Sequence, residues 1–178
     1  MSGKDYLGKV KGERGLLEKI MGYIPGYHGY KEKELRRESD RLVRMEAVSR
    51  LKAAKTSIRR AYANPAMVSK LSQENTYKYD ALNSRLDRIT QRIDRAVAGY
   101  AGMFDAVKVK ENKLDTVIQH DVSLIEKAET IKVDSKKVAK IQPGNDDWDT
   151  AMDSLISKVE EYDALIDERS EILRGLGG

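Results

Sequence analysis

The feature that most constrains this chain is a hydrophobic repeat of seven residues, which occurs in two separate stretches. Apolar residues follow alternating spacings of four and three from 82 to 107, and a similar spacing returns from 148 to 173. Such repeats favour long helices that pack side by side. We therefore predict an all-α fold, an elongated antiparallel helical bundle with coiled-coil-like seams, which a second copy of the chain could complete.

One charged residue interrupts the second seam. Arg169 takes the position between Ile166 and Leu173 that the repeat assigns to an apolar side chain. If Arg169 faces the seam, its replacement by leucine is expected to be neutral or stabilising, because burying an ion is costly. A large loss of stability would instead indicate a specific acidic partner.

Local signals divide the chain into helices. Asn64 and Pro65 predict a helix start, Asn112 and Asp115 resemble a capping box, and residues 134–145 predict the main loop. The helices expected from these signals are 13–23, 31–63, 65–108, 112–132 and a last one from 145 or 146. We expect one domain overall, with a short amphipathic helix and turn in 1–30 and the long-helix bundle in 31–178.

Composition excludes several classes of protein. The chain has no cysteine, so it has neither a disulfide nor a thiolate metal site. It also has no apolar run near the roughly 18 residues that span a bilayer, and no apolar segment of a secretory signal. These features predict a cytoplasmic protein, with peripheral attachment to a membrane as a further expectation.

Charge is unevenly distributed along the chain. Residues 1–62 carry a net +8, whereas residues 145–178 carry −7 and the whole chain carries +4. A basic first third can bind a phosphate-rich partner or an anionic membrane surface. The structural alternative is that the acidic last helix packs beside the basic second helix and partly neutralises it.

Residues with catalytic or metal-binding potential are few. The two histidines, His28 and His120, are far apart in sequence and without motif partners, so we expect both at the surface. The aspartates around Trp148 favour the start of a helix through its dipole, and they lack the spacing of a calcium loop. We therefore expect no catalytic residue, no metal site and no cofactor. An enzyme whose site forms only in the fold is the third functional alternative.

The stretch GYIPGYHGY, residues 22–30, is the main candidate for contact with a partner. Its glycines and Pro25 prevent a helix, so we expect an exposed turn between the apolar stripe of residues 16–24 and the basic start of the next helix. Tyrosine is favoured at interfaces because its large ring loses little entropy on binding. The structural alternative is that the tyrosines cover helix ends. The predicted partner-binding residues are Tyr23, Tyr27, Tyr30, Lys31, Lys33, Arg36 and Arg37.

The segment YIPGYHGYKEKELRRESDRL, residues 23–42, resembles one found in uncharacterised prokaryotic helical proteins that pair an IPGY-GY turn with a KE-RR helix start. This resemblance implies no activity or ligand. In outline, a short amphipathic helix followed by long helices is similar to phage-shock and ESCRT-III-like membrane proteins, which concerns the fold alone.

These observations predict a non-enzymatic helical scaffold or adaptor. Its basic, tyrosine-containing amino-terminal surface would contact a protein or an anionic surface, and we favour a membrane. The alternative is a nucleic-acid or ribosome-associated binding factor that uses the same residues.

Overall fold

Helices make up most of the protein. The computed structural model describes residues 3–96 and 109–175. In chain order these residues form α1 (Gly3–Tyr23), the 3-10 helix η1 (Lys33–Leu35), α2 (Arg36–Ala61), α3 (Pro65–Val68), α4 (Gln73–Asp94), α6 (Glu111–Val138) and α7 (Asp146–Arg174). No strand occurs in these two ranges, and the predicted all-α bundle is confirmed.

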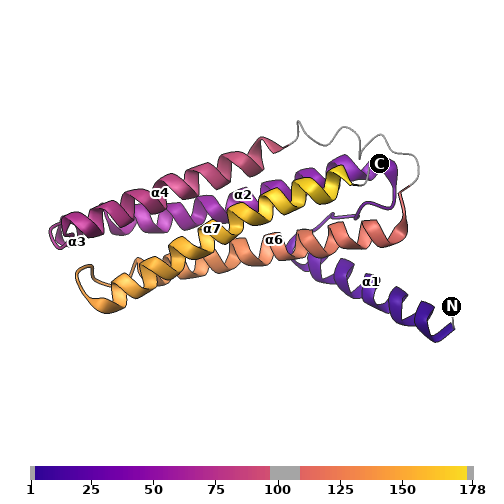
Figure 1. The fold of residues 1–178 in the computed structure, drawn as a ribbon, viewed down its shortest axis with the longest axis horizontal. Helices are drawn as coiled ribbons and strands as arrows, with labels where there is room; N and C mark the ends of the chain where they lie inside the picture. The colour runs from indigo at the N-terminus through magenta and orange to yellow at the C-terminus, as the bar shows by residue number, and fades with distance from the viewer. Residues whose placement is uncertain (1–2, 97–108, 176–178) are drawn as a thin grey trace.

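The four long helices form one elongated bundle (Figure 1). α2 packs against α4 and α6, and α7 packs against the same two helices, so α2 and α7 lie diagonally across the bundle. Helices that follow one another, α2 with α4 and α6 with α7, are antiparallel, whereas α2 runs parallel to α6 and α4 runs parallel to α7. α1 packs against α6, and its amino-terminal half points away from the bundle.

Both predicted seams lie in the core as far as the described residues extend. Their buried members are Leu82, Leu86, Ile89 and Ile93 on α4, and Trp148, Met152, Leu155, Val159, Tyr162, Ile166 and Leu173 on α7. Full burial of such a side chain contributes about 1.5–3 kcal/mol. The last members of the first seam, Tyr100, Met103 and Val107, lie outside the described residues.

The predicted helix 65–108 is interrupted. α3 ends at Val68, and a new helix begins at Gln73 because Ser72 and Asn75 form a capping box. The Ser72 hydroxyl accepts from the Asn75 amide at 3.0 Å, and Asn75 Oδ1 accepts from the Ser72 amide at 3.3 Å. This reciprocal pair satisfies two amides that a helix start otherwise leaves unpaired.

Three other boundaries also differ from the prediction. α1 begins at Gly3 instead of near residue 13, and α2 starts at Arg36 after the η1 turn. α6 continues to Val138, so the predicted loop 134–145 is shorter. The expected Asn112–Asp115 box does not form, because the N-cap is Lys110, which makes no side-chain capping bond. The predicted start of α7 is confirmed, since the Asn145 side chain accepts from the Trp148 amide at 2.8 Å.

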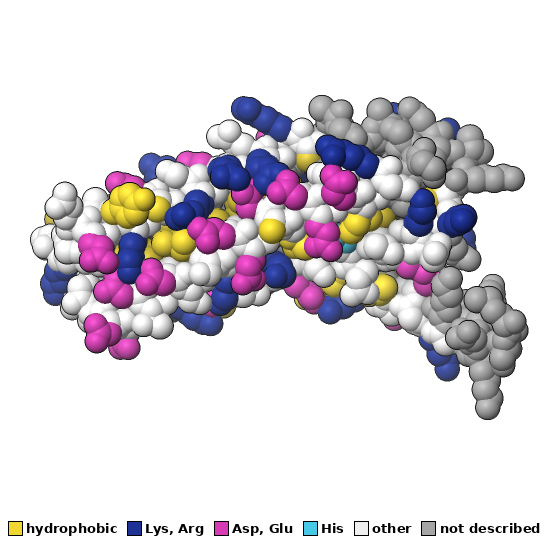
Figure 2. All heavy atoms as spheres, viewed as in Figure 1, with side chains coloured by type: hydrophobic (Ala, Val, Ile, Leu, Met, Phe, Trp, Pro, Cys, Tyr) yellow, Lys and Arg dark blue, Asp and Glu magenta, His cyan; other side chains and the backbone are white. Residues whose placement is uncertain are grey.

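The acidic α7 is paired with α4 and α6, not with the basic α2. Arg88 and Arg92 of α4 both contact Asp163, and Lys127 of α6 lies 3.3 Å from Glu161. Figure 2 shows cationic and anionic side chains interspersed on the visible face of the bundle. The expectation that α2 and α7 neutralise each other was therefore wrong, because these helices lie on a diagonal.

Candidate functional site

The Gly-Tyr stretch forms a tight turn between α1 and η1. Gly26 and Gly29 adopt φ values of +87° and +72°, which side chains other than glycine rarely adopt. A methyl group on Gly29 would lie 3.2 Å from Leu17 Cδ2, so the turn passes directly against α1. The Ser39 hydroxyl donates to the Gly29 carbonyl at 2.7 Å and fixes the turn to α2.

Two of the three tyrosines in this turn point into the protein. Tyr27 and Tyr30 are 1% and 0% exposed, and their rings meet edge to face at 6.2 Å. Both hydroxyls donate to Asp121 Oδ2 of α6, at 3.1 Å from Tyr27 and 2.5 Å from Tyr30. The predicted exposure of these two residues was wrong, because α6 supplies a buried carboxylate that satisfies both hydroxyls.

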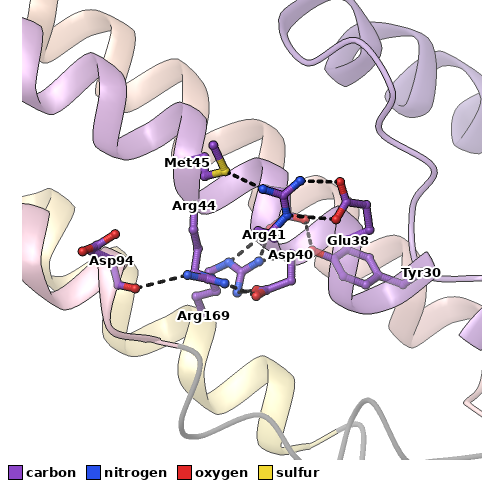
Figure 3. Close-up of polar contacts among 9 residues, drawn as sticks. Tyr30, Glu38, Asp40, Arg41, Arg44, Met45, Asp94 and Arg169 are labelled. Atoms are coloured by element: carbon purple, nitrogen blue, oxygen red, sulfur yellow. Dashed lines mark hydrogen bonds and ion pairs between the residues drawn. The ribbon is translucent and has the colours of Figure 1, made fainter. Parts of the chain in front are cut away.

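Asp121 belongs to a buried network of charges at this end of the bundle, and Figure 3 shows three other members, Asp40, Arg44 and Arg169. Arg169 of α7 donates through Nη2 to Asp121 Oδ1 at 2.9 Å, and its Nη1 lies 3.0 Å from Asp40 Oδ1 of α2. Arg44 completes the network, because its Nε donates to Asp40 Oδ2 at 2.8 Å. The network joins the turn, α2, α6 and α7. Arg169 therefore has two acidic partners, which is the second of the two alternatives that the sequence left open, and its replacement by leucine is expected to lower stability.

Burial dominates the ionisation of these groups. It raises the pKa of the Asp121 carboxyl despite the opposing charge of Arg169. It also raises the pKa values of Tyr27 and Tyr30 far above the ordinary value, with the negative charge of Asp121 acting in the same direction. At neutral pH both tyrosines are therefore neutral donors to Asp121.

His120, expected at the surface, is buried beside this network. Burial, followed by the charge of Arg169, lowers the pKa of His120 to about 4. Its Nε2 lies 3.7 Å from a carboxylate oxygen of Glu168. The helical phase of α6 causes the burial, because position 120 adjoins the core positions 117 and 124. His28, in contrast, is exposed as predicted.

The geometry of the buried network fits a structural role better than a catalytic one. Its acids and bases lie 0–8% exposed, so a ligand could reach them only if the turn opened. Most of their polar atoms also bind one another, as expected for a set that holds elements in place. Across the described residues, no group of three or more histidines and carboxylates could hold a metal ion.

The remaining predicted partner residues divide into exposed and covered ones. Lys31, Lys33 and Arg37 are exposed. Arg36 is buried, and its Nε donates to the Tyr30 carbonyl at 2.8 Å, so its predicted exposure was wrong. Tyr23 is half-buried, with the Arg50 guanidinium 5.4 Å from its ring centre.

The exposed part of this predicted site is not strongly basic. Glu32 and Glu34 alternate with Lys31 and Lys33, and all four are exposed, so their charges cancel. A contact with an anion therefore needs cations from further along the chain.

Those cations lie on the outward side of α2. The exposed positions of this helix are Arg37, Arg41, Met45, Ser49, Lys52, Thr56, Arg59 and Arg60. Five of the eight are cationic and none is acidic. We call Arg37, Arg41, Lys52, Arg59 and Arg60 the basic face. Sequence reasoning named only Arg37, although the positions opposite the apolar stripe of α2 would have identified the other four.

Several members of the basic face lack an internal partner. Arg41 binds Glu38, as Figure 3 shows. Among the described residues, no ion pair joins Lys52, Arg59 or Arg60 to a carboxylate. Three positive charges are therefore available to an outside anion.

The apolar stripe of α1 is already used within the protein. Ile20 and Ile24 are buried and Leu16 and Leu17 pack on the core, which leaves Met21 as the large exposed apolar residue in this part of α1. Insertion of residues 16–24 into a lipid layer would require α1 to leave α6. No helix in the described ranges is long and apolar enough to cross a membrane.

Comparison with protein-family models, with curated proteins and with solved structures finds no match for this chain. The resemblance of residues 23–42 to uncharacterised helical proteins therefore stays a prediction. The functional argument rests on the chain's own geometry.

Proposed function

We propose that this protein is a non-enzymatic helical scaffold that contacts an anionic surface through the basic face of α2. The observation that carries the proposal is the composition of that face, with five cations and no acid at eight exposed positions. Such a surface attracts anions over the Debye length and holds them through charge-assisted hydrogen bonds.

An anionic membrane is the surface that we favour. From Arg37 to Arg60 the cations extend over about 35 Å of a single helix, which can lie flat on a lipid layer. Each lysine or arginine near such a layer contributes about 1 kcal/mol, so the face supplies enough energy for reversible binding. Binding of this kind is electrostatic, because the apolar stripe of α1 is packed against α6.

A nucleic acid is the second candidate. Four of the five cations are arginines, and the arginine fork pairs with phosphate through two parallel hydrogen bonds. If each of the three available cations, Lys52, Arg59 and Arg60, contacts one phosphate of a duplex, a plot of log affinity against log salt concentration would have a slope of about −2.7.

Parallel binding assays test the proposal. Flotation with vesicles containing phosphatidylserine and gel shift with duplex DNA and RNA are each measured in a salt series. The informative variant is Lys52→Gln/Arg59→Gln/Arg60→Gln. The control, Lys127→Gln/Lys158→Gln/Arg174→Gln, removes the same charge from α6 and α7.

The first variant should lose most binding to the true partner, whereas the control should keep it. Equal loss in both variants would show that net charge alone matters and would overturn the assignment to α2. Binding to neither vesicles nor nucleic acid by the unaltered protein would overturn the proposal itself.

A further inference from the structure

The bundle carries a second charged surface, which the proposed function does not use. Thirteen positions of α7 are exposed, of which eight are acidic and one, Arg174, is basic. We call the eight carboxylates the acidic face. They are Asp146, Asp147, Asp153, Glu160, Glu161, Asp167, Glu168 and Glu171.

The acidic and basic faces point to opposite sides of the molecule. α2 and α7 each pack against α4 and α6, so their outward sides are turned away from each other. Each face is therefore open to a neighbour while the other is occupied.

The two faces also match in length. The cations from Arg37 to Arg60 extend over about 35 Å, and the carboxylates from Asp147 to Glu171 extend over about 36 Å. Both lie on a single unbroken helix, α2 and α7 respectively. Two straight helices of this length can contact each other along their whole exposed sides.

Short side chains on α7 leave room for such an approach. Ser154, Ser157 and Ala164 are exposed between the carboxylates. On the basic face, Met45 is 55% exposed among the cations. An apolar side chain in the middle of the basic face and small residues in the middle of the acidic one suit direct helix contact.

From this complementarity of charge, length and shape, we infer that the basic face of one copy docks on the acidic face of a second copy. The contact joins two different surfaces, so every docked copy keeps one free face and a row of copies can grow. The inference goes beyond the proposed function, because binding of an anionic surface makes no use of α7. An anionic surface and a second copy would compete for α2.

Ion pairs within each copy affect the strength of this contact and its dependence on salt. Six of the eight carboxylates already lie in internal ion pairs, but their side chains remain 55–72% exposed: Asp153 with Lys78, Glu160 with Arg85, Glu161 with Lys127, Asp167 with Arg92, Glu168 with His120 and Glu171 with Arg174. A carboxylate with this exposure can accept a second cation. Because every such pair stays close to water, we expect an association that salt weakens strongly.

Charge reversal on each face tests the inference. One variant is Lys52→Glu/Arg59→Glu/Arg60→Glu on α2, and the other is Glu161→Lys/Glu168→Lys/Glu171→Lys on α7. Circular dichroism first establishes that both are folded. Sedimentation velocity then measures the average mass between about 1 and about 100 µM, the range expected for weak complexes. It is run at about 0.1 M and about 1 M salt, where the Debye length falls from about 10 to about 3 Å.

The unaltered protein should exceed its monomer mass of 20.1 kDa by at least about twofold at the lower salt and return to monomer at the higher salt. Each variant alone should remain a monomer, and an equal mixture of the two should associate again. A monomeric unaltered protein, association that survives either reversal, or a mixture that stays monomeric would each overturn the inference. The α7 variant should still bind vesicles or nucleic acid, which separates this test from that of the proposed function.

Discussion

Replacing Arg169 with leucine should be among the most damaging substitutions in this protein. The change leaves Asp40 and Asp121 in the core without the guanidinium that lies 3.0 Å from one and 2.9 Å from the other. Asp40 keeps Arg44, but Asp121 loses the cation that neutralises it. Removing one partner of a buried pair typically costs 3–5 kcal/mol, against a total stability of about 5–15 kcal/mol.

Urea denaturation measures this loss with two probes. The chain's single tryptophan, Trp148, is fully buried and donates through Nε1 to the Tyr62 hydroxyl at 2.5 Å. It lies 21 positions before Arg169 on α7, about 32 Å along the helix. Coincident curves from Trp148 fluorescence and circular dichroism would therefore show that both ends of the bundle unfold together.

Two further variants distinguish the ion pair from the packing of the side chain. Arg169→Leu/Asp121→Asn removes the stranded charge but keeps an acceptor for the two tyrosine hydroxyls, so it should recover at least about half of the loss. Arg174→Leu removes an exposed arginine from the same helix and should change stability by less than about 0.5 kcal/mol. A loss below about 1 kcal/mol for Arg169→Leu, or no recovery in the double variant, would refute the reasoning.

Three further predictions concern the turn and its neighbours. Burial raises the pKa of Tyr62, and it raises the pKa values of Tyr27, Tyr30 and Tyr162 much further. Since the last three groups ionise only after unfolding, stability should fall above pH 10 by up to about 4 kcal/mol per pH unit, with a further rise in tyrosinate absorbance at the unfolding transition, beyond that of exposed tyrosines such as Tyr77. Gly29→Ala should destabilise more than Gly26→Ala, because both need a positive φ but only position 29 lacks space for a methyl group; equal melting temperatures would contradict this. The pKa of His120 is about 4 in the folded protein and about 6.5 in the unfolded chain, so the unfolded chain binds the proton first as the pH falls. Stability should therefore decrease by at most about 3 kcal/mol between pH 6.5 and pH 4, and His120→Gln should remove that dependence.

The helices and seams could be predicted because they depend on local periodicity. Leu82 and Leu86, or Trp148 and Met152, are neighbours on one helix, and their spacing alone assigns them to a common side. The break before α4 was not predicted, although the sequence contains its signal, the capping pair Ser72 and Asn75. The hydrophobic repeat that follows was given more weight than this two-residue signal. A second cap signal, at Asn112, was accepted although the structure does not use it.

The buried network could not be predicted from single helices, because it depends on how four elements align. Nevertheless the sequence contains its signal. Asp40, Asp121 and Arg169 each occupy a position in the apolar stripe of a different helix, namely α2, α6 and α7. Two negative residues and one positive residue at core positions should have been assigned to one another, since each would be costly to bury alone. Only Arg169 was noted, with an acidic partner as one of two alternatives, and Asp40 and Asp121 were not identified as that partner.

The same helix, α2, links the buried network to the proposed surface. Asp40 and Arg44 point inward to Arg169 and Asp94, while Arg41, on the next side of the helix, points outward to Glu38 and Met45 (Figure 3). The inward pairs fix the rotation of α2 about its axis, because a turn of the helix would take Asp40 away from Arg169. That rotation determines which residues face water. In the proposed anion contact, the tyrosines of the turn would therefore act indirectly, by holding Asp121 and Arg169 in the arrangement that turns the cations of α2 outward.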